Sequence, residues 1–211
     1  MKDNIKWLLL IPGLIVIIGL AYLVPKVAGI GGGNTPTQQI DPGVQQQMND
    51  AQNRINTYQS QTKTNPADVT AAKNLGEAYV DLAGMQSQDN QSINDADRNF
   101  KNAIDQFRKY LAVNPGDVDV TIDLGYAYSQ LGMAEVALRE FQAATAAAPK
   151  NQRAWLNIGY LYLQTGRADQ SKAPLQKAIN LDPNSDSGKE AKKFLDQANS
   201  GATPGLTPVS P

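Results

Sequence analysis

One constant interval separates matching residues throughout the second half of the chain. The matched pairs are Leu124 and Ile158, Gly125 and Gly159, Tyr128 and Tyr162, Gly132 and Gly166, Ala144 and Ala178, and Pro149 and Pro183, and the members of every pair differ by 34 in sequence number (for example 159 − 125 = 34). A constant period of this length is typical of an array of short helical repeats, each of which buries its apolar face against its neighbours. Such arrays bind other proteins, so the period indicates a class of function without indicating a partner.

Each repeat is predicted to contain two amphipathic helices joined by a tight turn at a glycine. In the second repeat, apolar residues recur at helical spacing on both sides of the turn: Leu124, Tyr128 and Leu131 before it, then Ala134, Ala137, Phe141 and Ala144. This spacing places each set on one face of a helix. The two faces are therefore expected to pack against each other.

Three glycines occupy the same position in the first helix of each repeat, at Gly76, Gly125 and Gly159. A glycine inside a helix costs about 1 kcal/mol relative to alanine. We expect the missing side chain to allow the two helices of each pair to approach closely.

These residues resemble the tetratricopeptide repeat, in which the first helix carries Leu-Gly and then Tyr, the second carries Ala, a large apolar residue and Ala, and Pro closes the unit. The third repeat matches at Trp155, Ile158, Gly159, Tyr162, Gly166, Leu175, Ala178 and Pro183. It departs at Ser171, where the family has Ala, and at Pro174, inside the expected second helix. The resemblance implies an all-α fold, a right-handed α-solenoid of helix pairs with capping helices at both ends.

The repeat domain is predicted over residues 44–198. Its repeats are placed at about 69–117, 118–151 and 152–185, and its capping helices at 44–62 and 188–198. Such helices cover the apolar faces that the end repeats of an array would otherwise expose. Residues 25–43 and 199–211 are rich in Gly, Pro and polar residues without periodicity, so we predict a flexible linker and a disordered tail.

The first repeat is longer than the others, because the prolines that bound it, Pro66 and Pro115, differ by 49 in sequence number instead of 34. Ser92 followed by Asp95 is similar to a capping box, in which a residue at the helix start and one three positions later satisfy free backbone N–H groups. We therefore expect the first helix to reach about Ser87 and the second to begin near Ile93. The insertion would form a projecting hairpin with its tip at residues 88–91.

A long apolar run, residues 7–24, follows a short charged leader, residues 1–6. About 18 apolar residues suffice for a membrane-spanning helix, and Pro and Gly are tolerated in one. A cleaved signal peptide is the alternative, but its best site, after Ala28, has Lys26 where a small residue is needed. We predict an uncleaved signal anchor of a single-pass membrane protein. Lysines in the leader favour a cytoplasmic N-terminus, with the repeat domain outside the cytoplasm.

Composition excludes several classes of function. The chain has no Cys and no His, and its net charge is −1. It therefore lacks the commonest metal ligands and the side chain best suited to proton transfer near neutral pH, and it has no basic footprint for nucleic acid. No phosphate-binding loop or nucleophile motif is present. We predict no enzyme activity, no catalytic residue, no metal, no cofactor, no small-molecule substrate and no nucleic-acid partner.

The resemblance also implies where a partner would bind, because the first helices of tetratricopeptide repeats line a concave groove. Carried over by register, the groove residues are Lys73, Asn74, Glu77, Asp119, Asp123, Tyr126, Arg153, Asn157 and Tyr160, with Asp81, Ile122, Gln130, Leu156 and Gln164 beside them. Tyr126 and Tyr160 are separated by one period and are expected to be aromatic contacts on the groove wall, outside the core. The carboxylate clamp of chaperone-binding members is rejected, because Glu77 and Asp123 stand where that clamp has Asn.

Two functions remain open. The first is a membrane-anchored scaffold or adaptor that holds a protein or peptide partner in an extracytoplasmic assembly. The alternative is a structural protein that self-associates as a homo-oligomer at the membrane and has no dedicated peptide ligand. For the first function, the projecting hairpin competes with the groove as the binding site.

Overall fold

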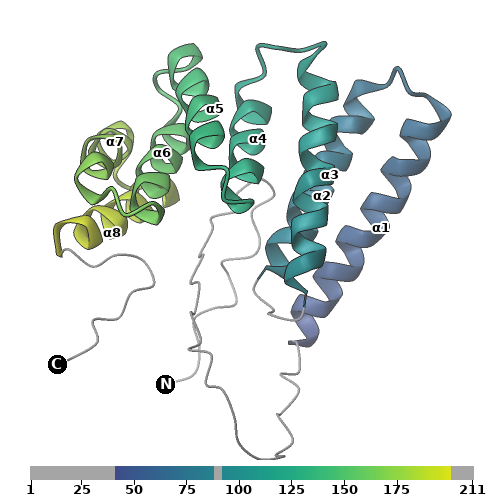
Figure 1. Cartoon of the computed structure of the whole chain (residues 1–211), viewed down its shortest axis with the longest axis horizontal. Helices are drawn as coiled ribbons and strands as arrows, with labels where there is room; N and C mark the ends of the chain where they lie inside the picture. The colour runs from purple at the N-terminus through teal and green to yellow at the C-terminus, as the bar shows by residue number, and fades with distance from the viewer. Residues whose placement is uncertain (1–40, 88–91, 201–211) are drawn as a thin grey trace, which may run out of the picture.

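The computed structural model describes residues 41–87 and 92–200, and their regular secondary structure is entirely α-helical. The helices are α1 (Pro42–Thr64), α2 (Val69–Gln86), α3 (Ile93–Leu111), α4 (Val118–Gln130), α5 (Ala134–Ala147), α6 (Gln152–Gln164), α7 (Ala168–Leu181) and α8 (Asp186–Ser200). They follow one another across the molecule from α1 at one end to α7 and α8 at the other (Figure 1). The all-α prediction is confirmed for the described residues.

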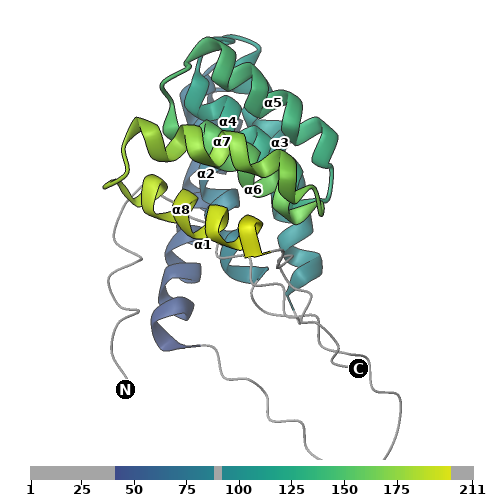
Figure 2. The same ribbon diagram turned by 90° about the vertical axis from the view of Figure 1, so that its left-hand side faces the viewer.

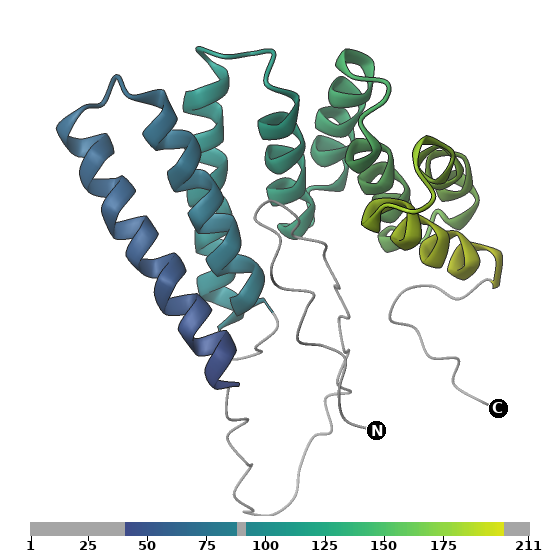
Figure 3. The same cartoon turned by 180° about the vertical axis from the view of Figure 1, so that it is seen from behind.

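The helices form three pairs, α2 with α3, α4 with α5, and α6 with α7, and each pair contacts the next. The first helices of the pairs also contact one another directly, α2 with α4 and α4 with α6. Among the described residues, the second helices α3, α5 and α7 make no such contact with each other. The array therefore curves, with α2, α4 and α6 on its inner face, and Figure 3 shows the row from behind.

Capping residues and glycines define the helix ends. The carboxylate of Asp117 accepts from the Val120 N–H at 3.1 Å, and the side chain of Asn151, one period later, accepts from the Ala154 N–H at 3.1 Å. These bonds satisfy N–H groups that have no partner inside the helix. At the opposite ends, Gly132 and Gly166 have φ of 72° and 73°. This left-handed backbone is accessible to glycine and turns the chain sharply into the next helix.

Close contacts at glycine hold each pair together. A Cβ on Gly125 would lie 2.7 Å from a ring carbon of Phe141, and one on Gly76 would lie 2.6 Å from the ring of Phe107. At Gly159 an added Cβ would collide with the side chain of Leu175. The predicted close approach is confirmed at all three glycines. The residues that contact them, Phe107, Phe141 and Leu175, occupy the same position in the second helix of each repeat.

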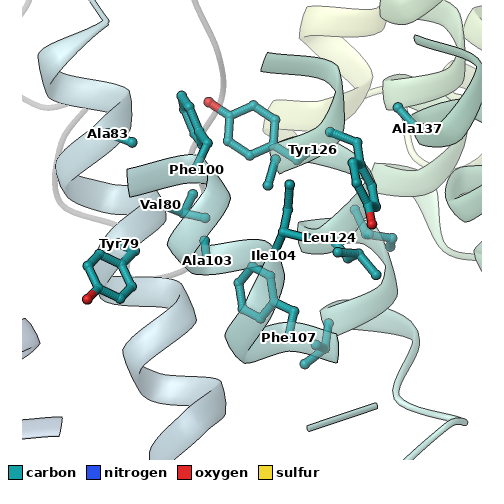
Figure 4. Close-up of a cluster of buried hydrophobic side chains, with 14 of the residues drawn as sticks. Tyr79, Val80, Ala83, Phe100, Ala103, Ile104, Phe107, Leu124, Tyr126 and Ala137 are labelled. Carbon is teal, nitrogen blue, oxygen red and sulfur yellow. The ribbon is translucent and has the colours of Figure 1, made fainter. Parts of the chain in front are cut away.

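Buried side chains form two apolar clusters along the array. The larger runs from α1 to α6, and part of it is shown in Figure 4, where Phe100, Ile104 and Phe107 of α3 lie between α2 and α4. The smaller joins α6, α7 and α8. Trp155 packs against both clusters. Pro174 lies inside α7, which runs without interruption from Ala168 to Leu181.

The first pair is longer than the others, as the insertion requires. In Figure 1, α2 and α3 extend further down the view than α4 and α5. The amide of Asn99 is buried and donates to Gln86 Oε1 at 2.8 Å, which ties the extended ends of the two helices together. Helix α2 ends at Gln86 and α3 begins at Ile93. The predicted tip, residues 88–91, lies outside the described residues.

Capping helices flank the repeats at both ends. Helix α1 begins at Pro42 and ends at Thr64, against a predicted 44–62, and α8 spans Asp186–Ser200, against a predicted 188–198. The amide of Gln152 on α6 binds the end of α7 and the connection to α8, because Nε2 donates to the carbonyl oxygens of Ala178 and Asp182 while Oε1 accepts from the Ser185 hydroxyl at 2.7 Å. Figure 2 views the array from this end, with α7 and α8 nearest the viewer.

Within residues 41–87 and 92–200, no helix combines the length and the apolar character needed to cross a bilayer. The predicted anchor, residues 7–24, lies outside the described residues, as do most of the linker and the predicted tail.

The same substitution at two glycines should have opposite effects on stability. Gly125→Ala should lower the free energy of unfolding by about 1–3 kcal/mol, because the added methyl group meets the Phe141 ring. Gly84→Ala, also within a helix, should raise it by up to about 1 kcal/mol, because an added Cβ there has nothing within 4 Å and alanine favours the helix. Urea denaturation measures both. Equal shifts for the two variants would contradict a helix contact at Gly125.

Candidate functional site

An ion-pair network crosses the inner face between α4 and α6. The guanidinium of Arg153 donates to Asp123 Oδ1 at 2.9 Å, to Asp119 Oδ1 at 3.4 Å and to the Asp119 carbonyl oxygen at 3.1 Å. The Asp119 side chain is largely exposed, with 70% of its surface accessible, whereas only 23% of the Asp123 side chain is accessible. The structure thus brings three predicted groove residues together, and one cation serves two carboxylates.

Asp123 is the most perturbed acid of this network. Burial raises its pKa to about 6, although the positive charge of Arg153 acts in the opposite direction. The negative charges of Glu77 and Asp119 raise the pKa further. Because burial favours the neutral form of Asp123 and the two neighbouring carboxylates add to this effect, its protonation becomes favourable at mildly acidic pH.

Lys73 is paired inside the fold. Its ammonium lies 3.2 Å from Asp117 Oδ2, which also accepts from the Tyr110 hydroxyl at 2.8 Å. Burial alone would lower the pKa of Lys73, but the hydrogen bond and charge of Asp117 outweigh it and raise that pKa. Lys73 therefore stays charged, and its charge already has a partner.

Glu77 is the acid of this face that forms no ion pair among the described residues. Burial raises its pKa, Lys73 lowers it, and Asp81 raises it again. Asp81, one turn further along α2, pairs with Arg54 of α1 at 2.8 Å. Sequence reasoning missed Arg54, because α1 was treated only as a cap. An arginine beside the buried Ile55 in a helix rich in uncharged residues was the available signal.

The expectation that Tyr126 and Tyr160 lie outside the core is wrong, because each is only 7% exposed. Tyr126 packs edge to face on Phe100 of α3, with ring centroids 5.9 Å apart. Tyr160 packs on Phe194 of α8 at 4.7 Å. Burial also raises the pKa of Tyr126, so its hydroxyl stays protonated. Replacing both tyrosines would damage the fold as well as any groove.

Two neighbours of the tyrosines are also in the core rather than on the groove wall. Ile122 is 1% exposed and Leu156 is 6% exposed. Asn74 and Asn157 are half-buried on α2 and α6. The accessible part of the inner face is therefore polar, with two amides and an excess of carboxylate over cationic groups.

Residues 122–186 match the tetratricopeptide repeat family. This stretch extends from within α4 to the first residue of α8 and covers most of the second and third predicted repeats. No curated protein matches the chain.

Three solved structures share the fold. A thermophilic tetratricopeptide repeat protein of Thermus thermophilus is 20% identical, with 74% of this chain and 75% of that chain covered and a TM-score of 0.57. Two structures of MamA are 19% and 20% identical, cover 77% of this chain and 95% and 84% of theirs, and have TM-scores of 0.53 and 0.54. The family match and the shared fold support a tetratricopeptide repeat protein.

A buried acid in α8 should make stability depend on pH. Glu190 Oε2 is buried without a hydrogen-bond partner among the described residues. Burial raises the pKa of Glu190 to about 7, with Lys193 lowering it and Asp186 raising it. Because the pKa is raised in the folded state, the contribution to stability is full below the unfolded value and is lost as pH rises through about 7.

Glu190→Gln should therefore raise the free energy of unfolding at pH 8 by about 1–3 kcal/mol, because the amide stays neutral, and should change it little at pH 4. Urea denaturation at the two pH values measures this. Asp196→Asn, an exposed change on the same helix, is the control. A Glu190→Gln effect of equal size at both pH values would show that ionisation of Glu190 is not involved.

Proposed function

We propose that this chain is a scaffold that holds a basic segment of a partner protein on its inner face. The observation that carries this proposal is the charge imbalance between α2, α4 and α6. Arg153 alone serves Asp119 and Asp123, and Glu77 forms no ion pair among the described residues. A cationic side chain from outside would meet carboxylates that the protein itself leaves partly uncompensated.

Electrostatics make a basic partner more favourable than an acidic one. A lysine or arginine near Glu77 would lower the raised pKa values of Glu77 and Asp123, and would gain interaction energy in return. An acidic side chain at the same place would add repulsion. Lys73 offers it little attraction, because Asp117 already lies 3.2 Å from the ammonium.

Amide groups beside the charges suit main-chain contacts. Asn74 and Asn157 are partly accessible on α2 and α6, and each can donate to and accept from a peptide backbone. Gln130 on α4 is half-buried, and its Nε2 atom is enclosed within the fold, so that donor is not accessible to a partner. The supported mode of binding is thus polar, in contrast to the aromatic groove expected from the sequence.

We further propose that the scaffold is anchored in a membrane through residues 7–24 and acts outside the cytoplasm. Support comes from the length of that apolar run, the poor cleavage site after Ala28, and the lysines of the short leader. The linker, residues 25–43, would then let the repeat domain stand away from the bilayer.

Glu77→Lys should weaken partner binding about tenfold or more, because it places a cation where the partner's cation belongs. The partner is first identified by photo-crosslinking in native membranes, with photoreactive residues placed at Asn74 and Asn157 and a matched probe at Gln176 on the exposed side of α7. The affinity of the identified partner is then measured for the full chain and its variants.

Asp169→Lys is the matched control, because it makes the same charge change at an exposed position of α7. If Glu77→Lys and Asp169→Lys weaken binding equally, the groove is not the site. Loss of binding only on deletion of residues 88–91 would assign the partner to the hairpin. Crosslinks made solely between copies of this chain would support the structural alternative.

Membrane anchoring predicts that the full chain sediments with membranes and resists extraction by salt and alkali. A form that lacks residues 1–28 should remain in the supernatant, because it retains no apolar run of membrane-spanning length. Mass spectrometry of the mature N-terminus provides a second readout. A mature protein that begins at Gly29 would show that the segment is a cleaved signal peptide.

A further inference from the structure

A second open surface lies between α3 and the turn that joins α4 to α5. It is a cleft of about 450 Å³, which is within the range of ligand sites in proteins. None of the groove residues lines it. Its apolar floor consists of Ile104, Tyr128, Leu131, Met133 and Val136. Met133, which immediately precedes α5, is 45% exposed, which is unusual for a large apolar side chain.

Three cations surround this floor: Lys101, Arg108 and Arg139. All three are exposed, and none of them forms an ion pair with another described residue. Burial raises the pKa of the neighbouring Glu140, although the positive charges of Arg139 and Arg108 act in the opposite direction. Asp105 is the only acid that lines the cleft, so its rim carries an excess of positive charge.

The equivalent positions one period further along, here called the second cleft, are bridged by side chains of the chain itself. Arg167 occupies the position of Met133, and Glu135 that of Lys101. The Arg167 guanidinium lies over the Tyr162 ring, 4.9 Å from its centroid, and 3.1 Å from Glu135 Oε1. Tyr162 is the counterpart of Tyr128.

The first cleft cannot close in this way. Met133 is uncharged, and Lys101 is positive where its counterpart Glu135 is negative, so the ion pair between Arg167 and Glu135 has no equivalent here. The floor is also more apolar, because Leu131 and Val136 correspond to Thr165 and Gln170 in the next repeat. In the first cleft Met133 is exposed and Leu131 and Val136 are partly exposed, whereas Ile104 and Tyr128 beneath them are buried. No side chain pairs across this surface as Arg167 and Glu135 do across the next, and its rim attracts anions.

We propose that this cleft binds an acidic segment of a partner protein. An apolar side chain of that segment rests on the accessible apolar residues Leu131, Met133 and Val136. Its carboxylates pair with Lys101, Arg108 and Arg139. Apolar burial supplies affinity, and the three cations supply specificity and orientation. This site is independent of the basic partner proposed for the inner face.

The test uses the full chain in detergent and a short fluorescein-labelled peptide of glutamate and leucine, followed by fluorescence anisotropy. Lys101→Glu combined with Met133→Arg rebuilds the side chains that close the second cleft. This closing variant should bind the peptide about tenfold or more weakly, without losing thermal stability. Lys109→Gln, an exposed neighbouring change that removes one positive charge, should bind like wild type.

A reciprocal variant tests the converse. Glu135→Lys with Arg167→Met removes the covering side chains of the second cleft and should raise the number of peptides bound per chain. Arg139→Gln, a single exposed change, should weaken binding more than Lys109→Gln and serves if the double variants fold poorly. Binding of the probe should also weaken as salt is added.

Three results would overturn the proposal. The closing variant, folded by circular dichroism, binds the peptide as tightly as wild type. A control peptide with serine in place of leucine binds equally well, which would show plain charge attraction without an apolar contact. A peptide with lysine in place of glutamate binds as tightly as the acidic probe, which would exclude charge recognition by the rim.

Discussion

The array depends on a close contact, within each helix pair, between a glycine of the first helix and a large apolar side chain of the second. At Gly125 the ring of Phe141 occupies space that any side chain would need, and Gly76 and Gly159 repeat the arrangement with Phe107 and Leu175. The helices of each pair are thereby fixed at one separation. Because each pair also contacts the next, that separation sets the spacing of α2, α4 and α6. The positions of the inner charges and of the outer cleft both follow from it.

The two open surfaces differ in charge although they are built from the same repeat. On the inner face, Arg153 is shared by two carboxylates, and Glu77 lacks an ion-pair partner among the described residues. On the outer side, Lys101 and Arg108 stand beside an apolar floor. A net charge of −1 conceals this separation. Opposite potentials on two faces suit a scaffold that holds two different protein segments at once.

Periodicity predicted the helix pairs, the glycine contacts and the lengthened first pair, because each of these depends on residues within one repeat. It failed for Tyr126 and Tyr160. Their burial depends on Phe100 from the lengthened α3 and on Phe194 from α8. Phe100 has no aromatic counterpart in the other repeats, and Phe194 lies one period after Tyr160 but in the capping helix (194 − 160 = 34). Arg54 was missed for the same reason, since it reaches Asp81 from α1. Register within a repeat predicts which way a side chain points, whereas the segments that cover it are set by tertiary contacts.

The division of the core into two apolar clusters has a consequence for how the chain unfolds. Residues of α7 and α8 are buried in a cluster that shares only α6 with the rest of the array. In a linear array each unit is stabilised mainly by its immediate neighbours. Detachment of α7 and α8 would break the smaller cluster, the Gln152 hydrogen bonds and the Tyr160 ring contact, while leaving most of the larger cluster intact. We therefore expect α7 and α8 to unfold together as one cooperative unit before the rest of the domain unfolds.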